Sequence, residues 1–242
     1  MSLEHEPLLF SEQKSRTYYA RRIERQAAIV RAVYGLTLTD TTKERWTDFW
    51  YFMRAADTYL DTPDGLRSQE EKNTHFINYV AEGDYGKHFA YLTKNALGAD
   101  AHDALTRRTI SLIHHNHAAK QATSPLRLIA NRAREGQLTA DIVLGLTEHI
   151  PADDAKFLKF ADHFRKAGAI STVFDTASDF HEDTVKEQLV LPYGIATNIS
   201  LFSLASMYSM RKLRHSTTRA MQHEVSFDVD GQPAQIEHEL KQ

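Results

Sequence analysis

The chain has 242 residues but no cysteine, and it is poor in glycine and proline, with 10 and 6. Without cysteine, disulfides and thiolate metal sites cannot form, which fits a reducing cytoplasm. The chain has no run of 18 or more apolar residues, so we expect no membrane-spanning helix. Its start carries neither a basic segment nor an apolar one, so we expect no secretory leader. The formal net charge of −3 disfavours nucleic acid as a partner.

Apolar residues recur at helical spacing between the scarce glycines and prolines. Trp46, Phe49, Trp50 and Met53 fall on one broad face, which predicts an amphipathic helix. With 42% hydrophobic residues, the chain can bury a sizeable core. We therefore predict an all-α fold, with one domain over residues 1–220 and a tail or short hairpin over 221–242. The predicted helices lie near residues 8–34, 41–61, 68–82, 86–97, 100–120, 125–134, 138–149, 153–187 and 194–221.

The first chemical motif lies at the end of the predicted helix 41–61. Asp57 and Asp61 are four residues apart, so both carboxylates point the same way, and Arg54 lies on the same side. The stretch around them is rich in aromatic residues, Tyr51 among them. Two like charges at this spacing disfavour the helix, and a hard cation with oxygen ligands would relieve their repulsion. A solvated helix end with Arg54 as an ion-pair partner is the competing interpretation.

The second motif is a ladder of carboxylates in the predicted helix 153–187. Asp175, Asp179 and Asp183 follow one another at four-residue intervals, and Glu182 lies beside them. Mg²⁺ binds in proteins through one or two carboxylates, substrate phosphates and water. Two acidic helices facing each other across a cavity would therefore hold a small cluster of Mg²⁺ ions against a diphosphate. A solvated acidic stripe on the surface is the alternative.

The second segment resembles a signature of the squalene/phytoene synthase family of class I isoprenoid synthases. In register with that signature, and without a gap, are Gly168, Asp179, Glu182, Asp183, Leu191 and Pro192. The family's first signature, R-x-x-D-x-x-x-D, is matched by Arg54, Asp57 and Asp61. The two acidic motifs are 122 residues apart, counted from Asp57 to Asp179, which is similar to the family's distance. Gly145 falls about where the family has a V-A-G-x-V-G segment.

This resemblance implies an isoprenoid-synthase-type helical bundle around a central cavity, and a transferase of terpenoid biosynthesis. The implied cofactor is Mg²⁺, and the implied substrate is a prenyl diphosphate that ionises and then undergoes condensation, cyclisation or transfer. An apolar product would favour peripheral association with a membrane. The implied catalytic residues are Asp57, Asp61, Asp179 and Asp183, and the implied metal ligands add Asp175 and Glu182. Arg54 and Tyr51 are expected to bind the substrate beside the first motif.

The chain also departs from the family's pattern. Thr172 replaces a glutamine, Asp175 an asparagine and Ser178 an arginine, and Glu187-Gln188 replaces a Gly-Arg pair. The chain after Pro192 is shorter than is usual in the family. A reaction with one substrate and a reaction with two are therefore both compatible with the sequence.

The early segment from Ser15 resembles the family's S-x-x-Y/F segment, which lies near a diphosphate. Tyr18 is its tyrosine, and Arg21 or Arg22 would bind phosphate oxygens. A basic helix face paired with Glu24 is the alternative.

Three histidines in the segment 114–117 do not make a metal site in this interpretation, because adjacent helical residues point in different directions. Surface or interface histidines are expected instead. The sequence lacks the paired Glu-x-x-His motifs of a di-iron bundle. A non-catalytic helical ligand-binding or interaction module remains the alternative to an enzyme, since it explains the helices but not two acidic motifs at matching distance.

Overall fold

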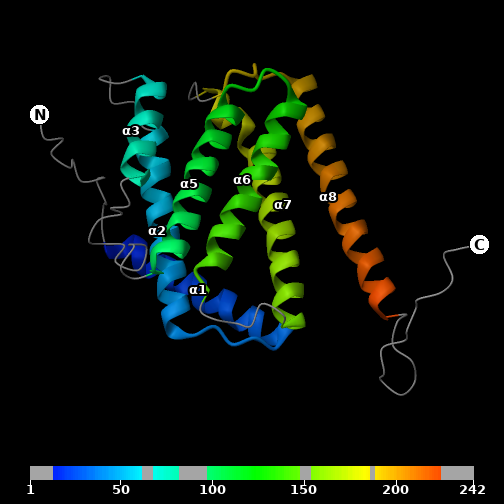
Figure 1. Ribbon diagram of the computed structural model, residues 1–242. Helices are drawn as coiled ribbons and strands as arrows, with labels where there is room; N and C mark the ends of the chain where they lie inside the picture. The colour runs from blue at the N-terminus through cyan, green and yellow to red at the C-terminus, as the bar shows by residue number, and fades with distance from the viewer. Residues whose placement is uncertain (1–12, 62–67, 82–96, 148–153, 186–188, 225–242) are drawn as a thin grey trace, which may run out of the picture.

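The computed structural model describes residues 13–61, 68–81, 97–147, 154–185 and 189–224 (Figure 1). All of its regular elements in these ranges are α-helices, which confirms the predicted all-α fold. They are α1 (Gln13–Tyr34), α2 (Asp40–Asp61), α3 (Gln69–Ala81), α5 (Ala99–Lys120), α6 (Pro125–Gly145), α7 (Ala155–Val185) and α8 (Ile195–Glu224). None of these helices is long and apolar enough to cross a membrane.

The predicted helices agree with the observed ones except at two places, and some of the predictions lie outside the described residues. Residues 125–145 form the single helix α6, whereas the sequence predicted a break between 134 and 138. The helix α8 continues to Glu224, so the first residues of the predicted tail are helical. The predicted helix 86–97 and the predicted hairpin turn at Asp230 lie outside the described residues, apart from Leu97.

Local chemistry sets several helix ends. Ser124 begins α6 because its hydroxyl accepts a hydrogen bond from the Arg127 amide, and Pro125 occupies the first helical position. Thr39 caps α2 in the same way through the Thr42 amide. At the end of α1, Gly35 adopts a φ of 65°, a left-handed conformation that glycine reaches without a Cβ clash.

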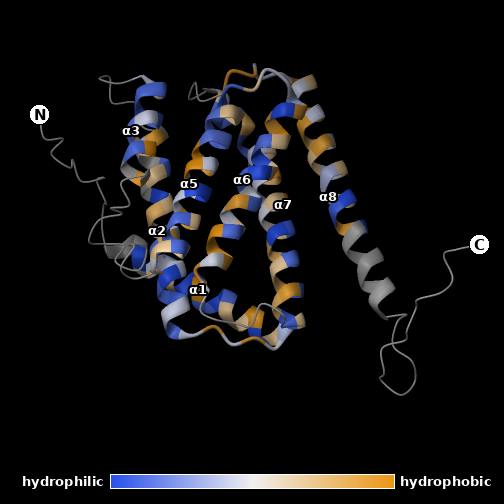
Figure 2. Ribbon diagram, in the orientation of Figure 1, coloured by the Kyte–Doolittle hydropathy of each residue, from blue (hydrophilic) through white to orange (hydrophobic). Residues whose placement is uncertain are grey.

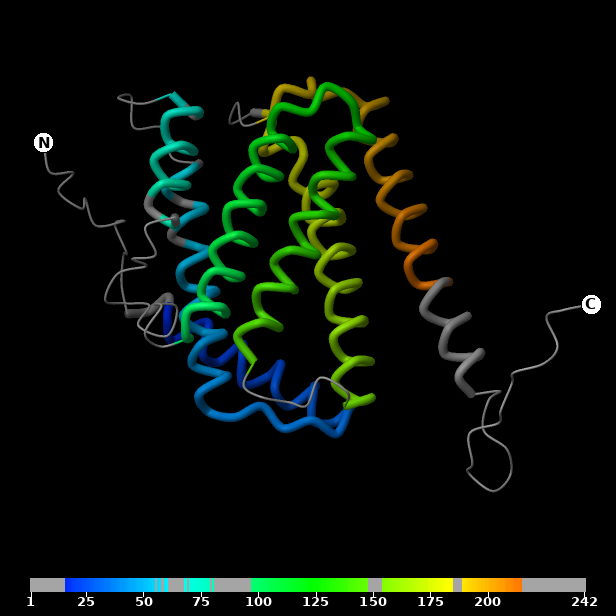
Figure 3. The backbone as a smooth tube through the Cα atoms, in the orientation of Figure 1, coloured from blue at the N-terminus to red at the C-terminus, as the bar shows by residue number. Residues whose placement is uncertain are grey.

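The helices α5, α6 and α7 run up, down and up beside one another in the centre of the molecule (Figures 1 and 3). On one side lie α2 and α3, on the other lies α8, and α1 crosses the lower end. Both α2 and α7 begin at this lower end and rise in the same direction. The two helices that carry the acidic motifs are therefore parallel.

Two apolar clusters form the core. The first joins α1, α2, α3, α5, the lower part of α6 and the start of α7, and it contains Trp46, Phe49 and Phe52. The second joins the end of α5, the start of α6, the upper part of α7 and α8, and it is built around Leu128 and Phe180. The first cluster thus occupies the left side and lower end of the view in Figure 1, and the second occupies the upper right.

The helices α6 and α7 touch backbone to backbone at Gly136 and Gly168. A Cβ added at Gly168 would lie 2.5 Å from the Gly136 carbonyl oxygen. A Cβ added at Gly136 would lie 2.7 Å from the Thr172 hydroxyl, and closer still to the Gly168 carbonyl. Only glycine at both positions permits this contact, which explains why Gly136 lies within a helix and does not end it.

Candidate functional site

The first acidic motif lies in the last turns of α2. The guanidinium of Arg54 contacts the Asp57 carboxylate at 3.0 Å, and both side chains are about half exposed. This is the ion pair that the solvated-helix-end interpretation foresaw. Asp61 is the last residue of α2, and its side chain lies outside the described residues.

The helix α1 brings a tyrosine and an arginine to this motif. Burial raises the pKa of the half-buried Tyr19 phenol, and the nearby positive charges of Arg54 and Arg22 oppose that increase. Tyr18 and Asp57 also act on this phenol, and both raise its pKa. The early segment and the first acidic motif are therefore close in space.

The other substrate-binding candidates on this side are placed differently. Tyr18 is exposed and meets the Tyr19 ring edge-on, with the centroids 5.3 Å apart. Arg21 is exposed on α1. Tyr51 is buried in the first apolar cluster. The tyrosine chosen from the sequence was Tyr18, but it is the phenol of Tyr19 on which the charges of Arg54 and Asp57 act.

The second acidic motif lies in the upper part of α7. Asp175, Asp179 and Glu182 are exposed, and Asp183 is partly buried. Partial burial of the carboxyl is the main cause that raises the pKa of Asp175, and the negative charge of Asp179 adds to it. Arg132 of α6 lowers the pKa of Asp175. The repulsion expected within the ladder is thus present between its first two members.

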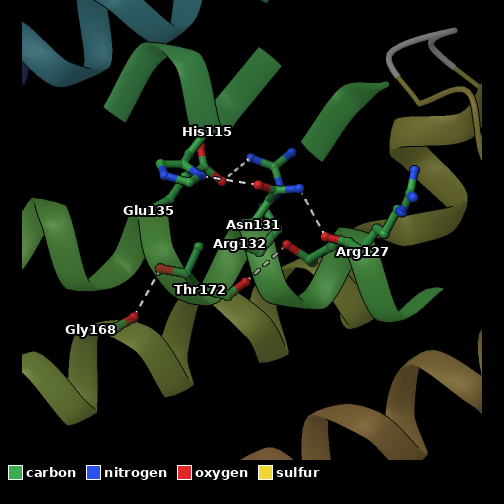
Figure 4. Close-up of polar contacts among 8 residues, drawn as sticks. His115, Arg127, Asn131, Arg132, Glu135, Gly168 and Thr172 are labelled. Atoms are coloured by element: carbon green, nitrogen blue, oxygen red, sulfur yellow. Dashed lines mark hydrogen bonds and ion pairs between the residues drawn. The ribbon is translucent and has the colours of Figure 1, made fainter. Parts of the chain in front are cut away.

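A buried polar cluster on α6 supports this second motif, and the sequence analysis did not select it. Arg132 and Glu135 form an ion pair at 2.9 Å, with side chains only 14% and 7% exposed. Figure 4 shows the pair beside His115 of α5 and Asn131 of α6, whose side chains are joined by a 3.0 Å hydrogen bond. The i, i+3 spacing of Arg132 and Glu135 was the available signal.

Small residues below the ladder set the spacing between α6 and α7. The Thr172 hydroxyl donates to the Gly168 carbonyl at 2.9 Å (Figure 4), and the Thr176 hydroxyl donates to the Thr172 carbonyl. Both hydroxyls are therefore satisfied within α7. Because Gly136 and Gly168 allow close approach, Arg132 comes near enough to act on Asp175. Gly145, which falls about where the family has its V-A-G-x-V-G segment, lies against the tip of Arg108.

The two acidic motifs start at the same level of the bundle. The Trp46 ring of α2 stacks on the Phe164 ring of α7, with centroids 5.7 Å apart and planes 24° apart. Counted along the sequence, the step from Trp46 to Asp57 equals the step from Phe164 to Asp175. Each step is about three helical turns, so both motifs begin roughly 16 Å beyond this stack.

The described contacts do not join the two motifs. Near Asp57, α2 packs through Phe52 and Leu60 in the first apolar cluster. Near Asp179, α7 packs through Phe180 in the second cluster. Asp57 pairs with Arg54 of α2 and acts on Tyr19 of α1, whereas Asp179 of α7 and Arg132 of α6 act on Asp175. That the carboxylates face each other across a cavity stays a prediction.

Two observations bear on the expected Mg²⁺. Among the described residues, no group of three or more histidine, aspartate or glutamate side chains is arranged to hold a metal ion, and Asp61 is not among the side chains described. The chemistry of the donors nevertheless fits Mg²⁺, because carboxylates are hard oxygen ligands. A cation would also relieve the repulsion that raises the pKa of Asp175.

The histidines of segment 114–117 point to separate neighbours, as expected. His114 is exposed. His115 bonds to Asn131 of α6, and His117 bonds to Asn73 of α3 at 2.8 Å. His115 and His117 therefore lie at interfaces of α5, whereas His114 lies on the surface.

Comparison with known proteins gave no relative: no family model, no curated protein and no solved structure matches the chain.

Proposed function

We propose that this chain is a Mg²⁺-dependent isoprenoid synthase of the class I type, acting on one or two prenyl diphosphates. The reaction would begin by breaking the bond between the allylic carbon and the diphosphate oxygen, with the electron pair leaving on the diphosphate. Condensation, cyclisation or transfer of the allylic cation would follow. The proposal derives from the two acidic motifs and their likeness to the squalene/phytoene synthase signatures.

One observation of the structure supports this proposal most directly. Trp46 and Phe164 stack in the lower parts of α2 and α7, and each motif begins about three turns further along its own helix. The parallel direction of the two helices keeps both motifs at one end of the bundle (Figure 3). Two sets of carboxylates at one level are what a shared diphosphate site requires.

In this proposal the carboxylates bind the metal ions and the arginines bind the diphosphate. The Mg²⁺ ions would bind to Asp57, Asp61, Asp175, Asp179, Glu182 and Asp183. Bound there, Mg²⁺ would neutralise the charge that grows on the departing diphosphate. On the α1–α2 side, the guanidinium groups of Arg54 and Arg22 would bind phosphate oxygens.

The decisive experiment is incubation with geranyl, farnesyl and geranylgeranyl diphosphates plus Mg²⁺, followed by product analysis. We expect turnover of at least one of them, and a loss of about a hundredfold or more in the double variant Asp57→Asn/Asp61→Asn. The matched control is Asp100→Asn/Asp103→Asn, which removes two exposed carboxylates from α5 and should keep full activity. Turnover that survives the α2 double change would exclude the roles proposed for Asp57 and Asp61.

A non-catalytic helical binding module is the second candidate. The exposed ion pair between Arg54 and Asp57 favours it, because such a pair needs no ligand to explain it. A chain of this kind would turn over none of the three diphosphates. Its melting temperature would also stay unchanged when Mg²⁺ and inorganic diphosphate are added together, whereas a ligand of the native state raises it.

A further inference from the structure

The outer face of α8 carries a stripe of large apolar side chains that no described element covers. Its members are all exposed, and they are Ile195, Ile199, Phe202, Met207, Met210 and Leu213. Ile195 is 78% exposed, and Ile199 and Met210 are 62% and 63% exposed. Single exposed apolar residues are ordinary on a protein surface, whereas several gathered along one side of a helix mark an interaction site.

The opposite face of α8 is already used for folding. Leu201 and Ala205 are fully buried in the second apolar cluster, and Leu204 and Tyr208 pack against it. Tyr208 also bonds to Gln137 of α6, which fixes the rotation of α8 about its own axis. The stripe therefore cannot turn inward without breaking these contacts.

The course of the stripe favours a flat partner over a second helix. Leu213 follows Ile195 by about five whole turns of a straight α-helix, so the two ends of the stripe point to the same side. Apart from Arg211, the exposed residues between its apolar members are small, Ser203 and Ser206 among them, so they would let a flat surface approach. A coiled-coil seam would instead follow a period of about 3.5 residues and wrap around its partner.

The charges of α8 favour an anionic partner. The whole chain has a formal net charge of −3, yet α8 has Glu224 as its sole acidic residue, and that is its last position. Arg211 and Arg214 are exposed beside the stripe, and Lys212 lies over the Tyr208 ring. Figure 2 shows the first half of α8 as mainly hydrophobic, with hydrophilic residues before its grey end. An apolar stripe flanked by cations that reach toward lipid headgroups is the pattern of a helix lying in a membrane interface.

We propose that α8 docks the protein on an anionic lipid membrane, with the stripe inserted among the acyl chains and Arg211 and Arg214 at the headgroups. Figure 1 shows α8 at the outer edge of the bundle, where a flat surface would reach it. This surface depends on α8 alone, so it holds whether or not the chain is an isoprenoid synthase.

The test is flotation of the full chain with vesicles of phosphatidylcholine and phosphatidylglycerol, without Mg²⁺ or substrate. We expect the chain to float with these vesicles, and Ile199→Asp/Met210→Asp to lower the vesicle-bound fraction about tenfold or more. The matched control is Ile29→Asp/Val33→Asp, which changes two equally exposed apolar residues on α1 and should float like the wild type. Circular dichroism melts of all variants would verify that each one folds.

A charge variant tests the headgroup contact. We expect Arg211→Glu/Arg214→Glu to lower binding about tenfold or more, whereas Arg25→Glu/Arg31→Glu on α1 should have little effect. If the chain floats equally well with vesicles of pure phosphatidylcholine, the proposed requirement for anionic lipid is wrong. No flotation at all would exclude membrane docking. A dimer in sedimentation that Ile199→Asp/Met210→Asp dissociates would also exclude it, and would indicate that a second copy of the chain covers the stripe.

Discussion

The buried ion pair of Arg132 and Glu135 is the single contact whose loss we expect to cost most. Removing one partner leaves a charge uncompensated in the interface between α5 and α6. We expect Arg132→Met to lower the free energy of unfolding by about 3 kcal/mol. Arg54→Met, which breaks the exposed pair with Asp57, should lower it by less than about 1 kcal/mol. Urea denaturation measures both.

A second variant separates charge from packing at this pair. Arg132→Met/Glu135→Leu removes both charges and keeps apolar volume, so much of the lost stability should return. If the double variant is as unstable as Arg132→Met alone, the destabilisation arises from lost packing, and our account of the pair is wrong.

Asp175 gives the protein a pH dependence with a definite sign. Because its pKa is raised in the folded state, the folded chain binds its proton more tightly than the unfolded chain does. The ordinary pKa of aspartate is about 4. The folded protein therefore loses stability as the pH rises from about 4 through the raised pKa of Asp175. We expect Asp175→Asn to be more stable than the wild type at pH 7, by no more than about 1 kcal/mol because the side chain is exposed.

The advantage of Asp175→Asn should shrink toward pH 4, which urea titrations at pH 4, 5.5 and 7 would show. Asp179→Asn should reproduce part of the effect, since it removes the neighbouring charge that helps to raise the pKa of Asp175. An advantage that stays constant with pH, or grows toward pH 4, would contradict this assignment.

From the sequence we selected the acidic residues of the candidate site together with Arg54 and Arg22, but not Arg132 or Tyr19. Carboxylates four residues apart are visible in the sequence because a helix places them on one side. The spacing of Arg132 and Glu135 is visible in the sequence, but that Arg132 lies near Asp175 and Tyr19 near Asp57 depends on how α6 meets α7 and how α1 meets α2. Such contacts between helices leave no periodic signal along the chain.

At the scale of helices, the contact between Gly136 and Gly168 holds α6 against α7. A Cβ at either position would meet the backbone of the other helix, which cannot move aside as a flexible side chain would. We expect Gly136→Ala and Gly168→Ala each to lower the free energy of unfolding by about 2 kcal/mol or more. Gly145→Ala is the matched control, because there the added Cβ meets the mobile end of Arg108.

The control should be neutral, or stabilising by up to about 1 kcal/mol, since alanine favours a helix more than glycine does. Thermal melts of the three variants would measure the difference. If Gly145→Ala is as damaging as the other two, the loss reflects a general effect of substitution in α6 and not the close helix contact.

The same contact explains the main error in the predicted helices. Helical periodicity and turn residues located most of the ends correctly, among them the start of α5 after Gly98 and the start of α6 at Pro125. Near Gly136 the sequence predicted a break, because glycine disfavours helices by about 1 kcal/mol relative to alanine. In the structure the packing of α6 on α7 outweighs that preference. Propensity is local, so it cannot reveal a partner as distant in the sequence as Gly168 is from Gly136.

At the scale of the whole molecule, the open question is how far apart the two acidic motifs lie across the bundle. The stack of Trp46 on Phe164 determines their level but not their separation. The absence of cysteine makes this measurable, because every thiol in an engineered variant is then a chosen one. The variant Asp57→Cys/Asp175→Cys places one thiol at the start of each motif.

We expect thiol-reactive cross-linkers of short length to join Asp57→Cys to Asp175→Cys, because facing motifs at one level are separated only by the width of the site. The control, Asp57→Cys/Asp162→Cys, keeps the same two helices but moves the second thiol roughly 20 Å down the axis of α7. It should require much longer linkers. Mass spectrometry of the cross-linked chains, over a series of linker lengths, gives the shortest one that joins each pair. If the control pair joins with linkers as short as those for Asp57→Cys/Asp175→Cys, the motifs do not face each other. The proposed diphosphate site would then lose its geometric basis, even if each motif bound Mg²⁺ by itself.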